Sequence, residues 1–224
     1  MASYGPRGVD SFASKVLICG PGPGYHAGYS HRPMKLELVL YNDPVLRRKG
    51  EKIEVFDAAL ERFTADMVET MHEQRGIGLA AQQVGRALQV CVIDLLSTDA
   101  EFDWKLDGAK TPLELFMPMV MVNPKVAVAK KAPLAVLEEG CLSFPDIRGD
   151  VERAQVLSVK YFDQYGLPHA LECTGLFARC VLHEVDHLNG ILFIDRMEKA
   201  VRDAIDDAVK ALAKQTRAAR AAAK

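Results

Sequence analysis

The 224-residue sequence lacks the features of a membrane protein or of a protein that binds nucleic acid through overall charge. It has no apolar run that approaches the roughly 20 residues needed to span a bilayer. Its formal net charge of −2 gives no reason to expect binding to DNA or to a membrane surface. It has no internal repeat. With 49% hydrophobic and 26% charged residues, the chain has the composition of one globular domain.

Cysteine is scarce and follows no pattern. The five cysteines are irregularly spaced, and no two of them form a CxxC pair: Cys19, Cys91, Cys141, Cys173 and Cys180. Since their number is odd and no secretory signal is recognisable, we expect free thiols in a reducing cytoplasm rather than a disulfide framework. Most of these cysteines are expected to be small packing residues.

Helical and strand periodicity is lacking in residues 1–33, which are rich in Gly, Pro, Ser and Tyr. We expect a disordered extension, a cloning remnant or an upstream misread start. Because basic residues outnumber acidic ones in this stretch, a transit peptide is the alternative, and it would place the protein in an organelle. The folded domain is expected over residues 34–200, followed by a basic C-terminal helix over residues 201–224.

The patterns from Met34 onward predict an α+β fold. Asp57 is placed to cap a helix whose apolar residues recur at helical spacing as far as Met71. Short runs rich in β-branched residues predict strands at 90–93, 119–122, 135–138, 155–161 and 169–173. Between the first two strands, residues 97–118 are expected to form a mostly polar connection.

A second helix is predicted from Gly175 to about Leu188, with Gly190 in the position of a C-terminal cap. The Ala-rich segment from Met197 onward is strongly helical by propensity. We therefore expect antiparallel β-sheets packed around the Gly175–Leu188 helix, with a further helix at the C-terminus.

The predicted central helix carries an HExxH motif that begins at His183. His183 and His187 are four residues apart and share one helical face, so both imidazoles can bind one metal ion. Glu184 can hold a water molecule and accept its proton. The alternative is a pair of solvated histidines beside an incidental glutamate. The motif does not extend to a metzincin protease site, because Phe193 occupies the position of the third histidine.

Two further segments contain residues suited to such a site. In Glu138–Ser143, Cys141 follows a predicted strand and a glycine, and its thiolate would suit Zn²⁺ or Fe²⁺ as a third ligand. Taken alone, this cysteine is more simply a core residue. In Gly76–Gly85, small residues allow close approach of a ligand, and Gln83 is a neutral donor that can polarise a carbonyl. Taken alone, this segment is more simply a tight turn into a strand.

Together, in order and spacing, the three segments resemble the signatures of peptide deformylases, which are GxGLAAxQ, EGCLS and HExxH. The resemblance extends over about residues 34–200, which would form the catalytic domain. It implies metal-dependent hydrolysis of the N-formyl group from the N-terminal formylmethionine of nascent polypeptides, with release of formate. Two departures affect no implied ligand: Gln82 replaces the commoner proline, and Leu182 replaces a frequent glutamine.

The resemblance also implies the residues of the catalytic centre. Cys141, His183 and His187 would bind one divalent metal ion, with water as the fourth ligand. Family behaviour suggests Fe²⁺ as the physiological ion, with Zn²⁺, Ni²⁺ or Co²⁺ able to replace it. Glu184 would act as the general acid and base.

The same resemblance implies how the substrate would be held. Gln83 and the backbone N–H of Leu142 would stabilise the oxyanion formed when the formyl carbon is attacked. The formylmethionyl peptide would lie along Gly78 and Arg148. The pocket for the methionine side chain would be lined by Ile77, Glu139, Leu176 and Cys180.

Other functions fit parts of this pattern. A zinc endopeptidase would share the HExxH helix but would need a third metal ligand downstream. A module that binds metal and peptide without turnover would need neither Glu184 nor Gln83. The predicted C-terminal helix has only basic charges after Asp207, which favours either a solvated tail or an arm that contacts ribosomal RNA.

Overall fold

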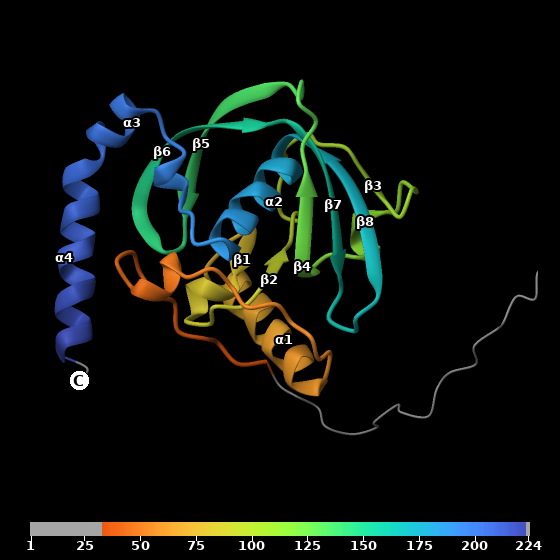
Figure 1. Cartoon of the computed structure of the whole chain (residues 1–224), viewed down its shortest axis with the longest axis horizontal. Coiled ribbons are helices and arrows are strands. Elements are labelled where there is room, and N and C mark those ends of the chain that lie inside the picture. The colour runs from red at the N-terminus through yellow and green to blue at the C-terminus, as the bar shows by residue number, and fades with distance from the viewer. Residues whose placement is uncertain (1–32, 223–224) are drawn as a thin grey trace, which may run out of the picture. The chain divides into compact units, whose positions relative to one another are not determined.

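The structure is a computed structural model that describes residues 33–222. Except for Pro33, the extension expected at residues 1–33 lies outside the described residues. Eight strands and several helices make up the described residues (Figure 1). The strands are β1 Gly78–Ala80, β2 Val90–Ile93, β3 Trp104–Leu106, β4 Met119–Ala127, β5 Leu134–Cys141, β6 Phe144–Ala154, β7 Val156–Phe162 and β8 Pro168–Thr174. The α-helices are α1 Ala58–Glu73, α2 Gly175–Leu188, α3 Lys199–Ala204 and α4 Asp206–Ala222. Four short 3-10 helices are η1 Pro44–Arg47, η2 Ala81–Val84, η3 Leu113–Leu115 and η4 Phe193–Asp195.

The strands form two antiparallel sheets. Six of them lie in the order β1-β2-β4-β7-β8-β3, and β5 pairs with β6 in a separate hairpin. Figure 1 shows α2 between this curved hairpin and the larger sheet, and α2 contacts strands of both. The fold is therefore α+β, with the HExxH helix at its centre as the sequence predicts.

The larger sheet is covered by α1 on one face and by α2 on the other. In β2, Val90 and Val92 pack with the apolar residues of α1, whereas Cys91 and Ile93 pack with those of α2. Successive side chains of a strand point to opposite faces, so a strand covered on both sides has no polar position. This double cover explains why β2 is apolar throughout.

Helix α1 begins where the sequence predicts. The Asp57 carboxylate accepts hydrogen bonds from the backbone N–H groups of Ala59 and Leu60 at 2.9 and 3.0 Å. These bonds satisfy donors that have no partner within the helix, so Asp57 acts as the N-cap. Leu60, Met67 and other apolar residues of α1 are buried against the sheet, consistent with their helical spacing.

The structure corrects the sequence interpretation in three segments. Residues 97–118 are more than a connection, because they contain β3, which pairs with β8 from Trp104–Cys173 to Leu106–Leu171. Strand β6 was not predicted, since its alternation is interrupted by Gly149 and by adjacent charged residues. The helical C-terminal segment is divided into α3 and α4 at Ile205, whose side chain packs against the core beneath β6.

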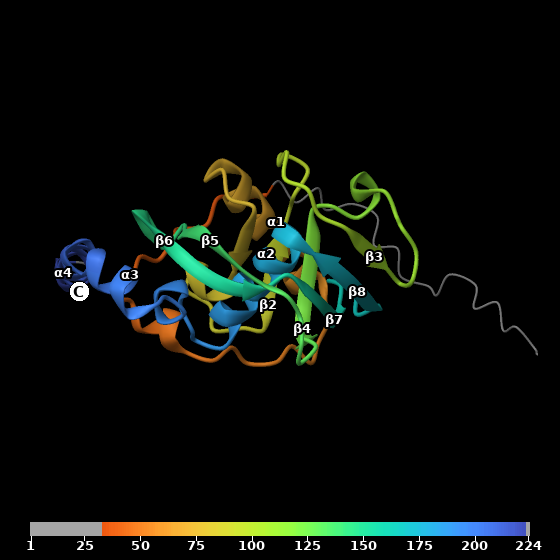
Figure 2. The ribbon, with the colours of Figure 1, turned by 90° about the horizontal axis from the view of Figure 1, so that it is seen from above.

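Helix α4 is attached to the domain rather than projecting from it. Val209, Leu212 and Thr216 are buried, and the first two belong to the core cluster around β6. At the far end of the helix, the Arg220 guanidinium lies 3.0 Å from the Asp43 carboxylate. Figures 1 and 2 both show α4 beside β6, on the outer side of the hairpin. Within residues 33–222, the structure contains no helix whose length and apolar character would allow it to cross a membrane.

Candidate active site

Three potential metal ligands from two distant segments converge beneath the β5–β6 hairpin. His183 and His187 lie one turn apart on α2, and Cys141 is the last residue of β5. Their ligand atoms lie within 4.8 Å of one another, and the Cys141 Sγ is 3.3 Å from the His187 Nε2. Among the described residues this is the one group of three or more His, Cys, Asp or Glu side chains with such spacing.

The three residues fit a divalent transition-metal ion. Tetrahedral coordination with a metal–sulfur bond near 2.3 Å and metal–nitrogen bonds near 2.0–2.1 Å places neighbouring ligand atoms about 3.3–3.6 Å apart. The separation between Cys141 and His187 falls in this range. One thiolate with two imidazoles suits Zn²⁺ or Fe²⁺, and three protein ligands leave a fourth position open.

A buried carboxylate orients the first histidine. The Glu139 Oε2 is 3.0 Å from the His183 Nδ1, which leaves the His183 Nε2 to face the cysteine. Burial alone would lower the pKa of His183, but hydrogen bonds to Cys141 and Glu139 raise it to about 10. Burial lowers the pKa of His187 well below its ordinary value, which keeps that imidazole neutral.

Glu139 also joins a buried network of charged side chains. Its carboxylate accepts hydrogen bonds from Arg153 at 2.6 and 3.0 Å and from Arg179 at 2.7 Å. Arg153 in turn donates to Asp186 at 2.8 Å. Burial raises the pKa of Glu139, but the hydrogen bonds from His183 and Arg153 outweigh it and hold the pKa at about 2. The carboxylate is thus charged, and it ties β5, β6 and α2 together.

Glu184 lies against β1, with its carboxylate next to Gly78. Only 3% of its surface is exposed, and its Oε2 has no hydrogen-bond partner among the described residues. Burial raises the pKa of its carboxyl to about 7, although the charges of His183 and Arg153 act to lower it. A Cβ atom at Gly78 would clash with the Glu184 carboxylate, so a side chain there would displace that carboxylate.

The Gln83 side chain has a fixed orientation. Its Oε1 accepts a hydrogen bond from the backbone N–H of Ala80 at 2.8 Å. Its Nε2 therefore points the other way and donates to the Cys141 Sγ at 3.4 Å. This places a neutral N–H donor beside the three ligands. Leu142 follows Cys141 directly, at the turn between β5 and β6, and its side chain packs against Gly76.

A cleft of about 490 Å³ opens beside these residues. Its walls are the segment that leads into β1, the β5–β6 hairpin and the part of α2 from Leu176 to Glu184. All but one of the site residues expected from the sequence line it: Ile77, Gly78, Gln83, Glu139, Cys141, Leu142, Arg148, Leu176, Cys180, His183 and Glu184. The exception is His187, which is buried.

Comparison with known proteins identifies the family of this chain. A family model described as polypeptide deformylase matches residues 35–203. The chain belongs to the polypeptide deformylase family. A peptide deformylase of Opitutus terrae is 59% identical over 186 residues, which cover 83% of this chain and 97% of the relative. A peptide deformylase of Brucella suis is 42% identical, and the match covers 80% of this chain and 93% of the relative.

Solved structures agree with the sequence comparison. The peptide deformylase of Plasmodium falciparum matches this chain with a TM-score of 0.70 at 34% identity, covering 81% of this chain and 98% of the other. This deformylase is accordingly a hydrolase that removes N-formyl groups from nascent polypeptides. The comparisons give no support to the endopeptidase alternative.

Sequence reasoning missed the charged residues that surround the deformylase ligands. Arg179 and Asp186 lie on the central helix at positions where burial alone would favour apolar side chains, and Arg153 lies in the unpredicted strand β6. For Arg179 and Asp186, the charge itself on an otherwise apolar helix is the feature of the sequence that could have identified them. Glu139, which is expected from the sequence beside the methionine pocket, lines the cleft, and its carboxylate also binds Arg153, Arg179 and His183.

Proposed function

We propose that Glu184, Gln83 and the Leu142 N–H carry out formyl hydrolysis at a metal ion held by Cys141, His183 and His187. The observation that supports this assignment best is the convergence of the three ligand atoms within 4.8 Å. The buried carboxylate and the oriented amide described above lie at the same inner end of the cleft. A site with three protein ligands, an adjacent carboxylate and a positioned donor is the arrangement that metal-assisted amide hydrolysis requires.

The residues of this chain divide the reaction between them. When bound, the metal ion supplies a Lewis acid that acidifies water and polarises a carbonyl. Glu184 accepts the proton of the attacking water on its carboxylate and later delivers it to the departing amine nitrogen. A pKa of about 7 suits a group that must both accept and donate a proton near neutral pH.

The two N–H donors act on the oxygen of the formyl group. The Gln83 Nε2 and the backbone N–H of Leu142 donate hydrogen bonds to the oxyanion that develops as the carbon becomes tetrahedral. The contact with Ala80 holds the Gln83 amide in place, so little reorganisation is needed in the transition state.

The cleft supports an extended formylmethionyl peptide as the substrate. Strand β1 is an end strand of the larger sheet, so its outer edge can accept a peptide as an added strand. Ile77, Leu176 and Cys180 offer an apolar surface for the methionine side chain next to the metal ligands. Arg148 lies further along the opposite wall, where it would contact the peptide chain.

We further propose that the physiological ion is Fe²⁺ and that Zn²⁺, Ni²⁺ or Co²⁺ can replace it, since a thiolate with two imidazoles accepts all of them. Four cysteines of the described residues are free thiols, which supports a reducing compartment such as the cytoplasm. The catalytic domain is proposed to span residues 34–200, in keeping with the family match at 35–203.

The test of this function is formate release from formyl-Met-Ala-Ser under anaerobic conditions. We expect turnover that a chelator abolishes and that added Fe²⁺ restores. Metal analysis of the protein purified anaerobically would identify the ion. Turnover that persists after complete removal of metal would overturn the assignment of the three ligands.

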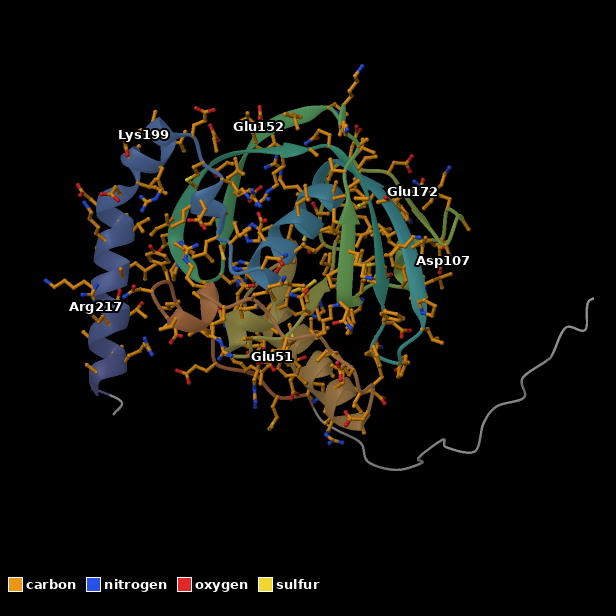
Figure 3. All side chains as sticks on the ribbon, in the orientation of Figure 1. Glu51, Asp107, Glu152, Glu172, Lys199 and Arg217 are labelled. Carbon is orange, nitrogen blue, oxygen red and sulfur yellow. The ribbon has the colours of Figure 1, made fainter. Side chains whose placement is uncertain are left out.

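A contact between α4 and ribosomal RNA is proposed as the route by which the enzyme meets nascent chains. Lys214 and Arg217 are exposed and, among the described basic residues of α4, are the two without an ion pair. Figure 3 shows Arg217 on this helix. Exposed basic side chains of this kind bind phosphate groups, and such binding weakens as salt is raised.

Charge reversal tests this contact better than truncation does. Removal of the chain after Asp207 would also remove the buried side chains of Val209 and Leu212 and so disturb the core. We expect the double variant Lys214→Glu and Arg217→Glu to lose co-sedimentation with ribosomes at low salt while retaining formate release. Unchanged co-sedimentation would rule out this contact.

A further inference from the structure

Arg75 is a cation that lines the catalytic cleft without a charged partner. Among the described residues its side chain makes no hydrogen bond or ion pair. The other two arginines of the cleft are compensated: Arg179 binds Glu139, and the Arg148 guanidinium lies 3.8 Å from the Glu138 carboxylate. The wall that leads into β1 therefore has one uncompensated positive charge.

The backbone at Arg75 is unusual for an arginine. Its φ is +56°, in the left-handed region, where it ends α1. The N–H groups of Arg75 and Gly76 donate to the carbonyls of His72 and Met71 at 2.9 Å, as at many helix C-termini. Glycine is the residue favoured at such a position, because other residues are strained there. The chain thus has a long charged side chain where glycine would fit with less strain.

The position of Arg75 along the wall corresponds to a definite part of the substrate. A Cβ atom at Gly78 would clash with the Glu184 carboxylate, so Gly78 marks the part of the wall beside the proposed proton carrier. Three residues of extended chain span at most about 10 Å, at roughly 3.3 Å per residue. A peptide that lies extended along this wall, with its formyl carbon beside Gly78, would place its third residue near Arg75.

We propose that Arg75 is a specificity-determining residue that favours an acidic side chain at the third position of the formylated peptide. This inference rests on the proposed mode of peptide binding along β1. The opposite wall carries both signs of charge, with Glu138 and Asp146 beside Arg148, and there Arg148 already has Glu138 as a partner. A carboxylate near Arg75 gains a partner, whereas a lysine there meets a like charge.

The test compares two peptides with amidated C-termini, formyl-Met-Ala-Asp-Ala and formyl-Met-Ala-Lys-Ala. We expect the wild-type enzyme to favour the aspartate peptide by about two- to five-fold in kcat/KM at low salt, the range of an exposed ion pair. The preference should fall in 0.5 M salt, because exposed charges are screened. In Arg75→Glu the order should reverse, so that the lysine peptide is the better substrate.

Two further variants separate this role from a structural one. Arg62→Glu makes the same change in net charge at an exposed position of α1 outside the cleft, and it should keep the wild-type order. Arg75→Gly relieves the positive φ, so it should be at least as stable as the wild type while losing the preference.

The outcomes distinguish this inference from the proposed function. Equal kcat/KM values for both peptides in the wild type and in Arg75→Glu would overturn the role of Arg75 alone. Failure of the wild type to release formate from either peptide would instead overturn the proposed function. Reversal in Arg62→Glu as well would show that the preference reflects overall charge and would also overturn the role of Arg75.

Discussion

The substitution Glu139→Gln tests whether the buried carboxylate beneath His183 supports both the fold and the metal site. Glutamine has nearly the same shape and mimics the protonated carboxyl. It would leave Arg153 with Asp186 as its only carboxylate partner, and it would leave Arg179 with backbone carbonyls alone. The loss of the charged partner of a buried guanidinium strongly destabilises the folded state.

The size of this effect can be worked out from the pKa of Glu139. A carboxyl whose pKa falls from an ordinary 4.5 to about 2 on folding contributes about 3 kcal/mol to stability at neutral pH. The loss of one partner of a buried ion pair typically costs about 3–5 kcal/mol, in agreement with this value. We therefore expect the free energy of unfolding of Glu139→Gln to be lower by about 3 kcal/mol at pH 7.

The same pKa predicts how the difference depends on pH. Because the pKa of Glu139 is lower in the folded state, its contribution is fully present above about pH 4.5 and is lost as the pH falls toward 2. The difference between wild type and Glu139→Gln that arises from this carboxyl should therefore shrink as the pH falls below 4.5. A difference that grew as the pH fell from 4.5 toward 2 would contradict the assignment.

The assays are urea unfolding at each pH, with and without metal, and competition for the metal ion with a chelator. We expect the variant to bind metal about 10- to 100-fold more weakly, because Glu139 no longer orients His183 as a charged acceptor. The matched control is Glu138→Gln on the same strand. Its side chain is 61% exposed, so its stability should change by at most about 1 kcal/mol. Equal stability and metal affinity in both variants would refute the reasoning.

Three other substitutions test the catalytic centre. Glu184→Gln should lower kcat for formyl-Met-Ala-Ser by at least about 10²-fold while retaining its metal ion, and full activity would exclude Glu184 as the proton carrier. Gly78→Ala would bring a Cβ to 2.3 Å from the Glu184 Oε1, so kcat should fall by about 10²-fold with the metal content unchanged. Cys141→Ser should weaken metal binding and favour harder ions; wild-type metal content after dialysis would argue against a sulfur ligand.

Much of the fold follows from local patterns. The Asp57 cap and the apolar spacing of α1, and the run between Gly175 and Leu188, predict two helices that the structure contains within a residue or two. Strand β3 could not be predicted in this way. It has only three residues, and its backbone groups are satisfied by β8, which is about 65 residues further along the chain.

The HExxH spacing, the cysteine after a glycine and the Gln83 amide are local patterns with specific chemical uses, so the chemistry proposed for the site can be predicted without the structure. The charges that support that site could not be predicted in the same way. Glu139 binds Arg153, Arg179 and His183 because β5, β6 and α2 meet at one point. Contacts between segments so far apart depend on how the whole chain packs, and no local spacing specifies them.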